Sequence, residues 1–322
     1  MNSYVAPVSD AVKTENYSNS ACASESQPPP SFGQVASNFE SYEPTAPPPE
    51  AFVFDSVPSD YIIYPHTCPP WTPSHAKYKI ENGGDIYSKD PLLESNKDEL
   101  WHFFLTHLSS SPTACIHAEG YHMETEYVQV SVKDAHGNTQ FETRAKEVKV
   151  IDFSFSIDVS PYVQKQWSAI AVIPEKDGRY QRFNDILETY SSSKNSLKQI
   201  CIRKKIEWDV RSVVDMVYNV IRFSGFTRKV DVHVSTNGDK IKVLSASDMS
   251  ALANSSFVRC LCVLSCCCII FGPMYLMRRH KMDNNIVAKY PVMISVEQLY
   301  ARNYWPIYAA VKERVKGRTW IG

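Results

Sequence analysis

The sequence predicts an α+β protein: an antiparallel sheet with packed helices, a disordered N-terminal tail and one C-terminal transmembrane helix. Residues 61–250 mix the alternation of strands with the three-to-four spacing of helices. Residues 1–60 carry nine of the 20 prolines and no extended apolar period. Residues 257–277 are almost uncharged over roughly the length that a helix needs to cross a bilayer.

Charge is distributed unevenly along the 322 residues, although the net charge is only -1. Eight acidic residues and Lys13 give residues 1–60 a charge of -7, whereas nine basic and three acidic residues give residues 278–322 a charge of +6. A basic end beside an apolar segment suits an anionic leaflet. Because the cysteines form no disulfide framework and the N-terminus has no secretory signal pattern, we expect a reducing compartment.

The first 60 residues are predicted to be a disordered, Pro/Ser-rich acidic tail, because they hold too little apolar surface to offset the entropy of ordering. Two proline clusters, at 28–32 and 44–49, could act as polyproline II ligands of WW or SH3 domains. The alternative is that they are plain spacers.

Residues 61–195 are predicted to form an α+β region with an antiparallel sheet. The run 61–64 has the composition of a short strand. Ser95 and Asp98 match a capping box, and the apolar spacing after them predicts a helix over 96–109.

The sheet of this region is expected in three segments, 114–119, 126–133 and 139–157, with a hairpin turn at 136–138. A helix is predicted near 180–190. In the last strand, period two places Phe153, Phe155 and Ile157 on a core face and Asp152, Ser154, Ser156 and Asp158 on a solvent face.

Residues 196–250 are predicted to form a small strand-helix-hairpin unit. After a strand with alternating isoleucines, Asp209 is the expected N-cap of a helix that stops at Gly225. The pair Asn237-Gly238 is a strong hairpin signal. The predicted hairpin joins strands 229–234 and 240–244 through the turn 236–239.

The apolar segment 257–277 is predicted to be a single-pass transmembrane helix, because a buried soluble helix of this length rarely lacks a polar face. A core helix is one alternative. The other is a hairpin that enters and leaves on one side at Gly272-Pro273. The basic cluster after the segment favours a cytosolic C-terminus, but the missing signal argues against exporting the N-terminal region. We therefore expect the bulk of the chain in the cytosol.

Five cysteines lie within the apolar segment. Cys260 and Cys262, beside Arg259, are candidates for S-acylation at a membrane boundary. Metal binding is an alternative with little support, because a lipid-facing helix cannot converge these thiols on one ion. The remaining alternative is that these cysteines serve only as apolar residues of the segment.

Residues 278–322 are predicted to be a basic amphipathic tail. Aromatic and apolar residues lie over 296–315 with basic residues alongside, which fits an element lying on the bilayer or one packed back on the folded region. Arg278, Arg279 and Lys281 are candidate contacts for anionic lipid.

A second basic patch, Arg203, Lys204 and Lys205, could contact anionic lipid or be a solvated strand end. We expect no nucleic acid, because no aromatic side chains interleave these charges.

The sequence contains no phosphate-binding loop, no dinucleotide fingerprint, no nucleophile elbow and no His-Glu-x-x-His motif, so it implies no cofactor. The remaining candidate for a metal or catalytic site is the group His117, Glu119, His122 and Glu124. The alternative is ordinary hydrogen-bonded surface.

The order of these parts resembles a family of uncharacterised fungal single-span membrane proteins, some of which are loosely labelled ABC transporter proteins. The likeness covers residues 28–322 and includes the helix sequence at 98–105 and the strand at 150–158. It carries no known active site, and the missing phosphate loop gives no support to the label.

Together these features predict a membrane-anchored, non-enzymatic adaptor or scaffold whose partner is the lipid bilayer. Two alternatives stay open. One is a membrane-associated enzyme with a site around His117 and His122, and the other is a module that binds anionic lipid through Arg203, Lys204 and Lys205.

Overall fold

The computed structural model describes residues 29–33, 54, 57–81, 83–133, 139–174, 178–255, 280–281, 286–317 and 319–320. Most of the predicted tail and the whole predicted transmembrane segment 257–277 lie outside these residues. In the part of the chain that is described, no helix is both long and apolar enough to cross a membrane.

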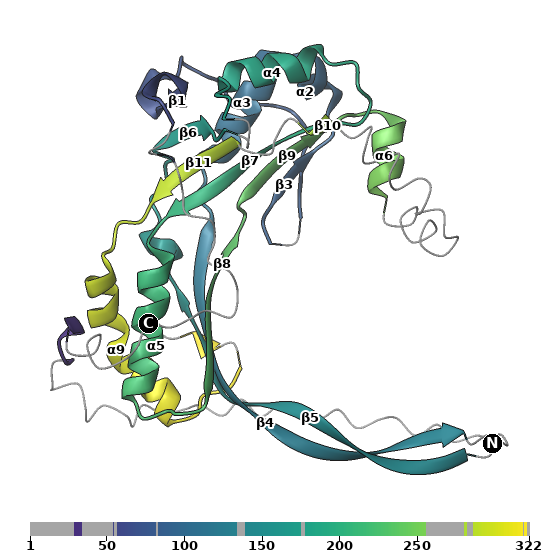
Figure 1. The fold of residues 1–322 in the computed structure, drawn as a ribbon. Helices are drawn as coiled ribbons and strands as arrows, with labels where there is room; N and C mark the ends of the chain where they lie inside the picture. Colours follow the sequence, from purple (N-terminus) through teal and green to yellow (C-terminus); the bar gives the residue numbers. More distant parts are fainter. Residues whose placement is uncertain are drawn as a thin grey trace, which may run out of the picture.

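Two sheets organise the fold (Figure 1). The strands of sheet A are β1 (Ile62–Ile63), β2 (Lys79–Ile80), β3 (Ile86–Ser88), β6 (Ala169–Val172), β7 (Lys198–Glu207), β9 (Lys240–Leu244), β10 (His280–Lys281) and β11 (Ile286–Pro291). Their order is β1-β6-β11-β7-β9-β3-β2, with β10 beside β7. The strands of sheet B are β4 (Thr113–Lys133), β5 (Thr139–Asp158), β8 (Lys229–Asn237) and β12 (Thr319–Trp320), in the order β12-β5-β4-β8.

The α+β class is confirmed, but the prediction of an antiparallel sheet holds only in part. Strands β4, β5 and β8 are antiparallel. Sheet A is mixed, because β11 and β10 run parallel to β7 and β3 runs parallel to β9. Parallel neighbours need long crossover connections, and alternation within one strand carries no information on the direction of its neighbour.

Helices cover one face of each sheet (Figure 1). Over sheet A lie α2 (Pro91–Ser95), α3 (Lys97–Leu108) and α4 (Phe183–Ser192), and against sheet B lie α5 (Val210–Phe223) and α9 (Val296–Lys312). The helix α6 (Asp248–Asn254) follows β9, and three 3-10 turns lie at Ser59–Tyr61, Pro65–Thr67 and Ser160–Tyr162. The predicted helices near 96–109, 180–190 and after Asp209 are thereby confirmed.

Helix boundaries follow local capping chemistry. Asp209 caps α5 by accepting from the backbone N–H of Ser212, as predicted. Gly225, which stops the helix, has a φ of +88°. The cap of α3 is Asn96 rather than Ser95, because a separate short helix, α2, occupies the residues before it.

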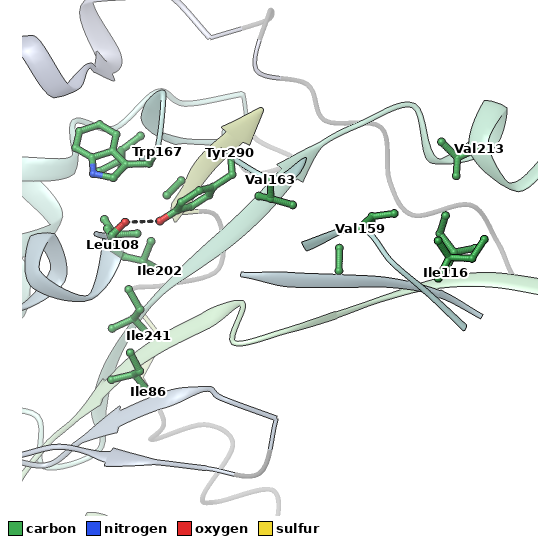
Figure 2. Close-up of a cluster of buried hydrophobic side chains, with 14 of the residues drawn as sticks. Ile86, Leu108, Ile116, Val159, Val163, Trp167, Ile202, Val213, Ile241 and Tyr290 are labelled. Atoms are coloured by element: carbon green, nitrogen blue, oxygen red, sulfur yellow. Dashed lines mark hydrogen bonds between the residues drawn. The ribbon is translucent and has the colours of Figure 1, made fainter. Parts of the chain in front are cut away.

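One apolar core runs through both layers. In Figure 2, Ile86, Ile241 and Ile202 follow one another across the neighbouring strands β3, β9 and β7. Nearby, the phenol of Tyr290 donates a 2.6 Å hydrogen bond to the carbonyl of Leu108. This buried bond joins β11 to the last turn of α3 and satisfies a carbonyl that the helix leaves without a partner.

The predicted hairpin at 229–244 is wrong. Strand β8 pairs with β4 in sheet B, whereas β9 pairs with β7 and β3 in sheet A. Gly238, with a φ of +66°, carries the chain from one sheet to the other. An asparagine-glycine pair predicts a sharp reversal of the chain but not the pairing of the two strands that it joins. Strands β8 and β9 pair instead with the longer strands β4 and β7, with which they form more backbone hydrogen bonds than they could form with each other.

The two predicted strands at 114–119 and 126–133 form one continuous strand, β4, which pairs with β5 from Cys115 to Lys133. The register shifts at Gly120/Tyr121, which marks a β-bulge. Phe153, Phe155 and Ile157 are buried as predicted. Asp152 and Ser156, predicted on a solvent face, are buried as well.

Residues after the apolar segment form part of the fold. Strand β11 lies between β6 and β7, and α9 buries Leu299, Tyr304, Ile307 and Val311 against α5 and sheet B. Of the two alternatives for 296–315, packing on the folded region is therefore the one found.

Candidate functional site

The residues of the predicted basic patch, Arg203, Lys204 and Lys205, lie on two different faces of β7. Lys204 is 4% exposed, and its ammonium donates to the carbonyl of Ser110 at 2.8 Å, on the side of the sheet that the helices cover. Arg203 and Lys205 point to the opposite face, because successive side chains alternate. Lys204 therefore does not belong to a lipid-binding patch, whereas Arg203 and Lys205 share a face.

Neighbouring strands add basic residues to the face that holds Arg203 and Lys205. Lys240 lies opposite Arg203 in the ladder and Lys289 lies opposite Lys205, while Lys242 lies one step further along β9. We call this set the basic face: Arg203, Lys205, Lys240, Lys242 and Lys289. Because Lys240 and Lys242 are two positions apart in a strand, the sequence predicts that they share a face. That this face is the one that holds Arg203 and Lys205 follows only from the pairing of β9 with β7.

Acidic and apolar groups border the basic face. Lys289 pairs with Glu207, and Lys240 lies 3.8 Å from Asp85 and 3.6 Å from Asp239. At the β6 end, Phe54 and Val57 pack over Ala169 and Ala171. The face thus combines cations with an apolar border, a combination found on proteins that lie on anionic membrane surfaces.

Burial perturbs the titratable groups on the helix-covered side. Desolvation lowers the pKa of Lys204 to about 8, partly opposed by Asp85 and Asp239. Desolvation, aided by the nearby Lys204, lowers the pKa of His107 to about 4. Both groups are packed inside the fold, so these shifts indicate structural burial rather than a reactive site.

Strand β10 returns the chain to sheet A after the apolar segment. Strand β10 runs parallel to β7 with Lys281 opposite Gln199, and on the other edge of β7 Leu244 lies opposite the same Gln199. The chain therefore leaves sheet A and returns to it at the same level of one strand. Arg278, Arg279, Cys260 and Cys262 lie outside the described residues.

The predicted metal or catalytic group does not converge. The two nitrogens of His117 lie 2.7 Å from the hydroxyls of Ser156 and Ser235, while Glu119 pairs with Lys149. Within the described ranges, no three His, Cys, Asp or Glu side chains are placed to hold a metal ion. The hydrogen-bonded alternative therefore describes His117.

His122 belongs to a separate cluster at the bulge. Its ring lies 2.9 Å from Asp152 and 2.7 Å from Glu124, and Arg228 donates to Asp152 at 2.8 Å. Hydrogen bonds that the protonated ring donates to the carboxylates of Glu124 and Asp152 raise the pKa of His122. Burial opposes ionisation of Asp152, but its bonds to His122 and Arg228 hold its pKa below the ordinary value. This network explains why Asp152 is buried.

Beyond this cluster, β4 and β5 continue as a two-stranded ribbon away from the rest of the fold (Figure 1). We call Met123–Lys133 with Thr139–Lys149 the arm. Tyr127 is 74% exposed and Phe141 is 72% exposed. Among the described strands, none pairs with the outer edges of the arm. The sequence predicts that β4 and β5 are strands, but it does not predict that they extend beyond the rest of the fold. The alternation of side chains is the same whether or not a hairpin packs against other elements.

A shallow pocket of about 280 Å³ lies elsewhere, lined by Pro65, Cys68, Trp71, Leu105, Ser109, Lys165, Gln166 and Trp167. Burial raises the pKa of the Cys68 thiol, which makes it a poor nucleophile. The pocket therefore offers apolar surface rather than catalytic groups.

Comparison with protein-family models, curated proteins and solved structures found no match for this chain. The resemblance to uncharacterised fungal proteins therefore stays a prediction.

Proposed function

We propose that the protein is a non-enzymatic adaptor attached to a membrane, with the bulk of the chain in the cytosol. The segment 257–277 inserts into the bilayer, the basic face lies toward anionic headgroups, and the arm presents open strand edges to an extended segment of a partner protein.

One observation carries the mode of attachment: β11 lies between β6 and β7 although it follows the apolar segment in sequence. Strands on opposite sides of a bilayer cannot share hydrogen bonds, so both flanks of the segment belong on one side. This supports insertion as a hairpin at Gly272-Pro273 in place of a single crossing.

The basic face supports the orientation of the folded region. Arg203, Lys205, Lys240 and Lys242 lie on adjacent strands, and Lys281 enters the same sheet directly after the segment. Each basic side chain close to an anionic surface contributes about 1 kcal/mol, which the salt concentration reduces.

The arm supports the adaptor role. A two-stranded ribbon has unpaired backbone groups along both edges, and such edges bind a partner's extended segment by adding a strand. An isolated hairpin is also only marginally stable in water, so a third strand would stabilise it.

Protease protection tests the attachment. The full chain, tagged at both termini and inserted into sealed vesicles, should have both tags on the same side, either both digested or both protected. One tag digested and the other protected would mean a single crossing and would contradict the proposal.

Flotation with vesicles tests the basic face. Arg203→Glu combined with Lys242→Glu should weaken attachment to vesicles containing phosphatidylserine, and the difference should shrink at high salt. The matched control is Lys194→Glu combined with Lys229→Glu, which changes the charge by the same amount at two exposed lysines, in the loop after α4 and in β8. Equal flotation of the two variants would exclude a role of the face in lipid contact.

A further inference from the structure

A short N-terminal motif is docked on α9. Residues 29–33, Pro-Pro-Ser-Phe-Gly, lie beside this helix as the short dark segment in Figure 1. The phenol of Tyr300 donates a 2.6 Å hydrogen bond to the carbonyl of Pro30. The ring of Phe32 lies 5.4 Å from that of Tyr300 at an angle of 71°, an edge-to-face contact. One of the two proline clusters is thus engaged within its own chain.

The motif lies at the end of a row of aromatic rings. Tyr300 contacts Tyr304 at 5.4 Å between ring centres, and Tyr304 contacts Trp305 at 5.0 Å and Tyr308 at 6.2 Å. Tyr304 is 1% exposed and supports Tyr300 from within the core, so Tyr300 is the ring that contacts the motif. Aromatic rings receive proline-rich segments in several peptide-binding domains. We call Tyr300 with the rings behind it the α9 aromatic site.

The docked motif makes the two kinds of contact that define a peptide ligand. Phe32 packs against the core as an apolar anchor, and the Pro30 carbonyl accepts from a tyrosine that is only 3% exposed. Burial raises the pKa of Tyr300 to about 12, which keeps its phenol a donor. A hydrogen bond in such a site is worth more than one at an open surface.

The motif reaches α9 through a long connection. Residues 34–53 separate Gly33 from Phe54, which packs near β6 in sheet A. A fully extended connection of this length can span roughly 70 Å, since each residue can reach about 3.5 Å. The motif is therefore a tethered ligand, and its local concentration is on the order of millimolar.

We propose that the α9 aromatic site binds short peptides of the Pro-Pro-x-Phe kind, and that residues 29–33 occupy it as an intramolecular competitor. A partner protein that presents the same chemistry binds after the chain's own motif leaves. A partner therefore binds the site only when it competes successfully with residues 29–33.

Fluorescence anisotropy of a labelled peptide with the sequence of residues 27–35 tests this proposal on the full chain. Phe32→Ala should bind the peptide about tenfold more tightly than the wild type, because a competitor at about 1 mM masks a site with a Kd of about 100 µM by that factor. Phe39→Ala, which removes another phenylalanine from the same region, is the matched control and should bind as weakly as the wild type.

A second substitution locates the site. Adding Tyr300→Phe to Phe32→Ala removes the donor and keeps the ring, and should weaken peptide binding about three- to tenfold. Binding unaffected by Tyr300→Phe, or equal in wild type and Phe32→Ala, would overturn the proposal. So would a concentration-dependent dimer that Phe32→Ala abolishes, since the motif would then dock on a second copy.

If Phe32→Ala does not fold, a protease site within residues 34–53 replaces it. Cleavage frees the motif from its tether without changing it, so the added peptide should then exchange with it and bind as tightly as predicted for Phe32→Ala. No gain in peptide binding after complete cleavage would contradict the proposal.

Discussion

Leu244 and Lys281 lie on the two edges of β7 at the same level, because each is opposite Gln199 in its own ladder. Adjacent strands are about 4.8 Å apart, so the two backbones are separated by roughly 10 Å. The ladders thus bring the two sides of the apolar segment back to one place in sheet A. The two ends of the apolar segment can therefore be joined by a much shorter connection without moving β9 or β10.

Replacing residues 256–279 by about ten glycine and serine residues should therefore preserve the fold. The free energy of unfolding should change by less than about 1 kcal/mol, because closing a somewhat shorter loop alters the entropy only slightly. Denaturant titration followed by circular dichroism measures this change. The shortened chain should also attach to vesicles more weakly and keep only the salt-sensitive contribution of the basic face.

The control for this replacement is the same chain with Ile286→Asp added, which places a carboxylate on the helix-covered face of β11, where Ile286 is 1% exposed. That variant should unfold. If the loop replacement alone abolishes folding, the segment contributes to the core rather than to a membrane.

The sequence allowed the local elements to be predicted better than their partners. Helices α3 and α5 and the Phe153 strand follow from spacing and capping within a few residues. The partner of β8 could not be predicted, because Asn237-Gly238 reports only a local reversal. Pairing between β11 and β7 joins residues about 80 positions apart, and no pattern within either strand specifies such a distant partner.

The candidate site shows the same limit. Alternation along a strand places Lys204 on one face of the sheet and Arg203 and Lys205 on the other. This could be predicted from the sequence once 200–206 was recognised as a strand. The contributions of Lys240 and Lys289 require the register of three strands. The docking of Phe32 on Tyr300 joins a proline-rich stretch to a distant helix, whereas composition predicts disorder or a ligand for another protein there.

Gly120→Ala should destabilise the protein by about 1–3 kcal/mol, as overpacking of a core does. A methyl group at this position would overlap the ring of Phe153, which is fully buried and cannot move into solvent. The midpoint of urea unfolding measures the effect. Phe153→Leu should partly rescue Gly120→Ala, and strictly additive losses would show that the bulge, and not the ring, rejects a side chain.

His122 should make stability depend on pH at the base of the arm. Its pKa is raised in the folded state by Glu124 and Asp152, so its contribution is complete below the unfolded value near 6.5. That contribution is lost as the pH rises through the higher folded value. His122→Gln should flatten this decline in unfolding experiments between pH 6 and 9.

A double-mutant cycle isolates this effect. In a chain that already carries Glu124→Gln and Asp152→Asn, His122→Gln should change the pH dependence no further. A decline in stability between pH 6 and 8 that survives in the triple variant would assign the effect to another group.

Lys204→Met should stabilise the protein and remove a second pH dependence of the opposite sign. Burial lowers the pKa of Lys204 to about 8, below the unfolded value near 10.5, so the unfolded chain binds more protons between these values. Stability of the wild type should therefore rise as the pH increases from about 8 to 10.5. The shift corresponds to about 3 kcal/mol of penalty below pH 8.

Methionine keeps the length of the side chain but gives up the hydrogen bond to Ser110, so we expect a net gain of about 1–3 kcal/mol at pH 7. The matched control is Lys205→Met, one position along β7 on the basic face, which should leave the rise above pH 8 in place. Thermal unfolding at pH 7, 8 and 9.5 distinguishes the two variants. A loss of stability at pH 7 in Lys204→Met would mean that the bond to Ser110 outweighs the burial of the charge.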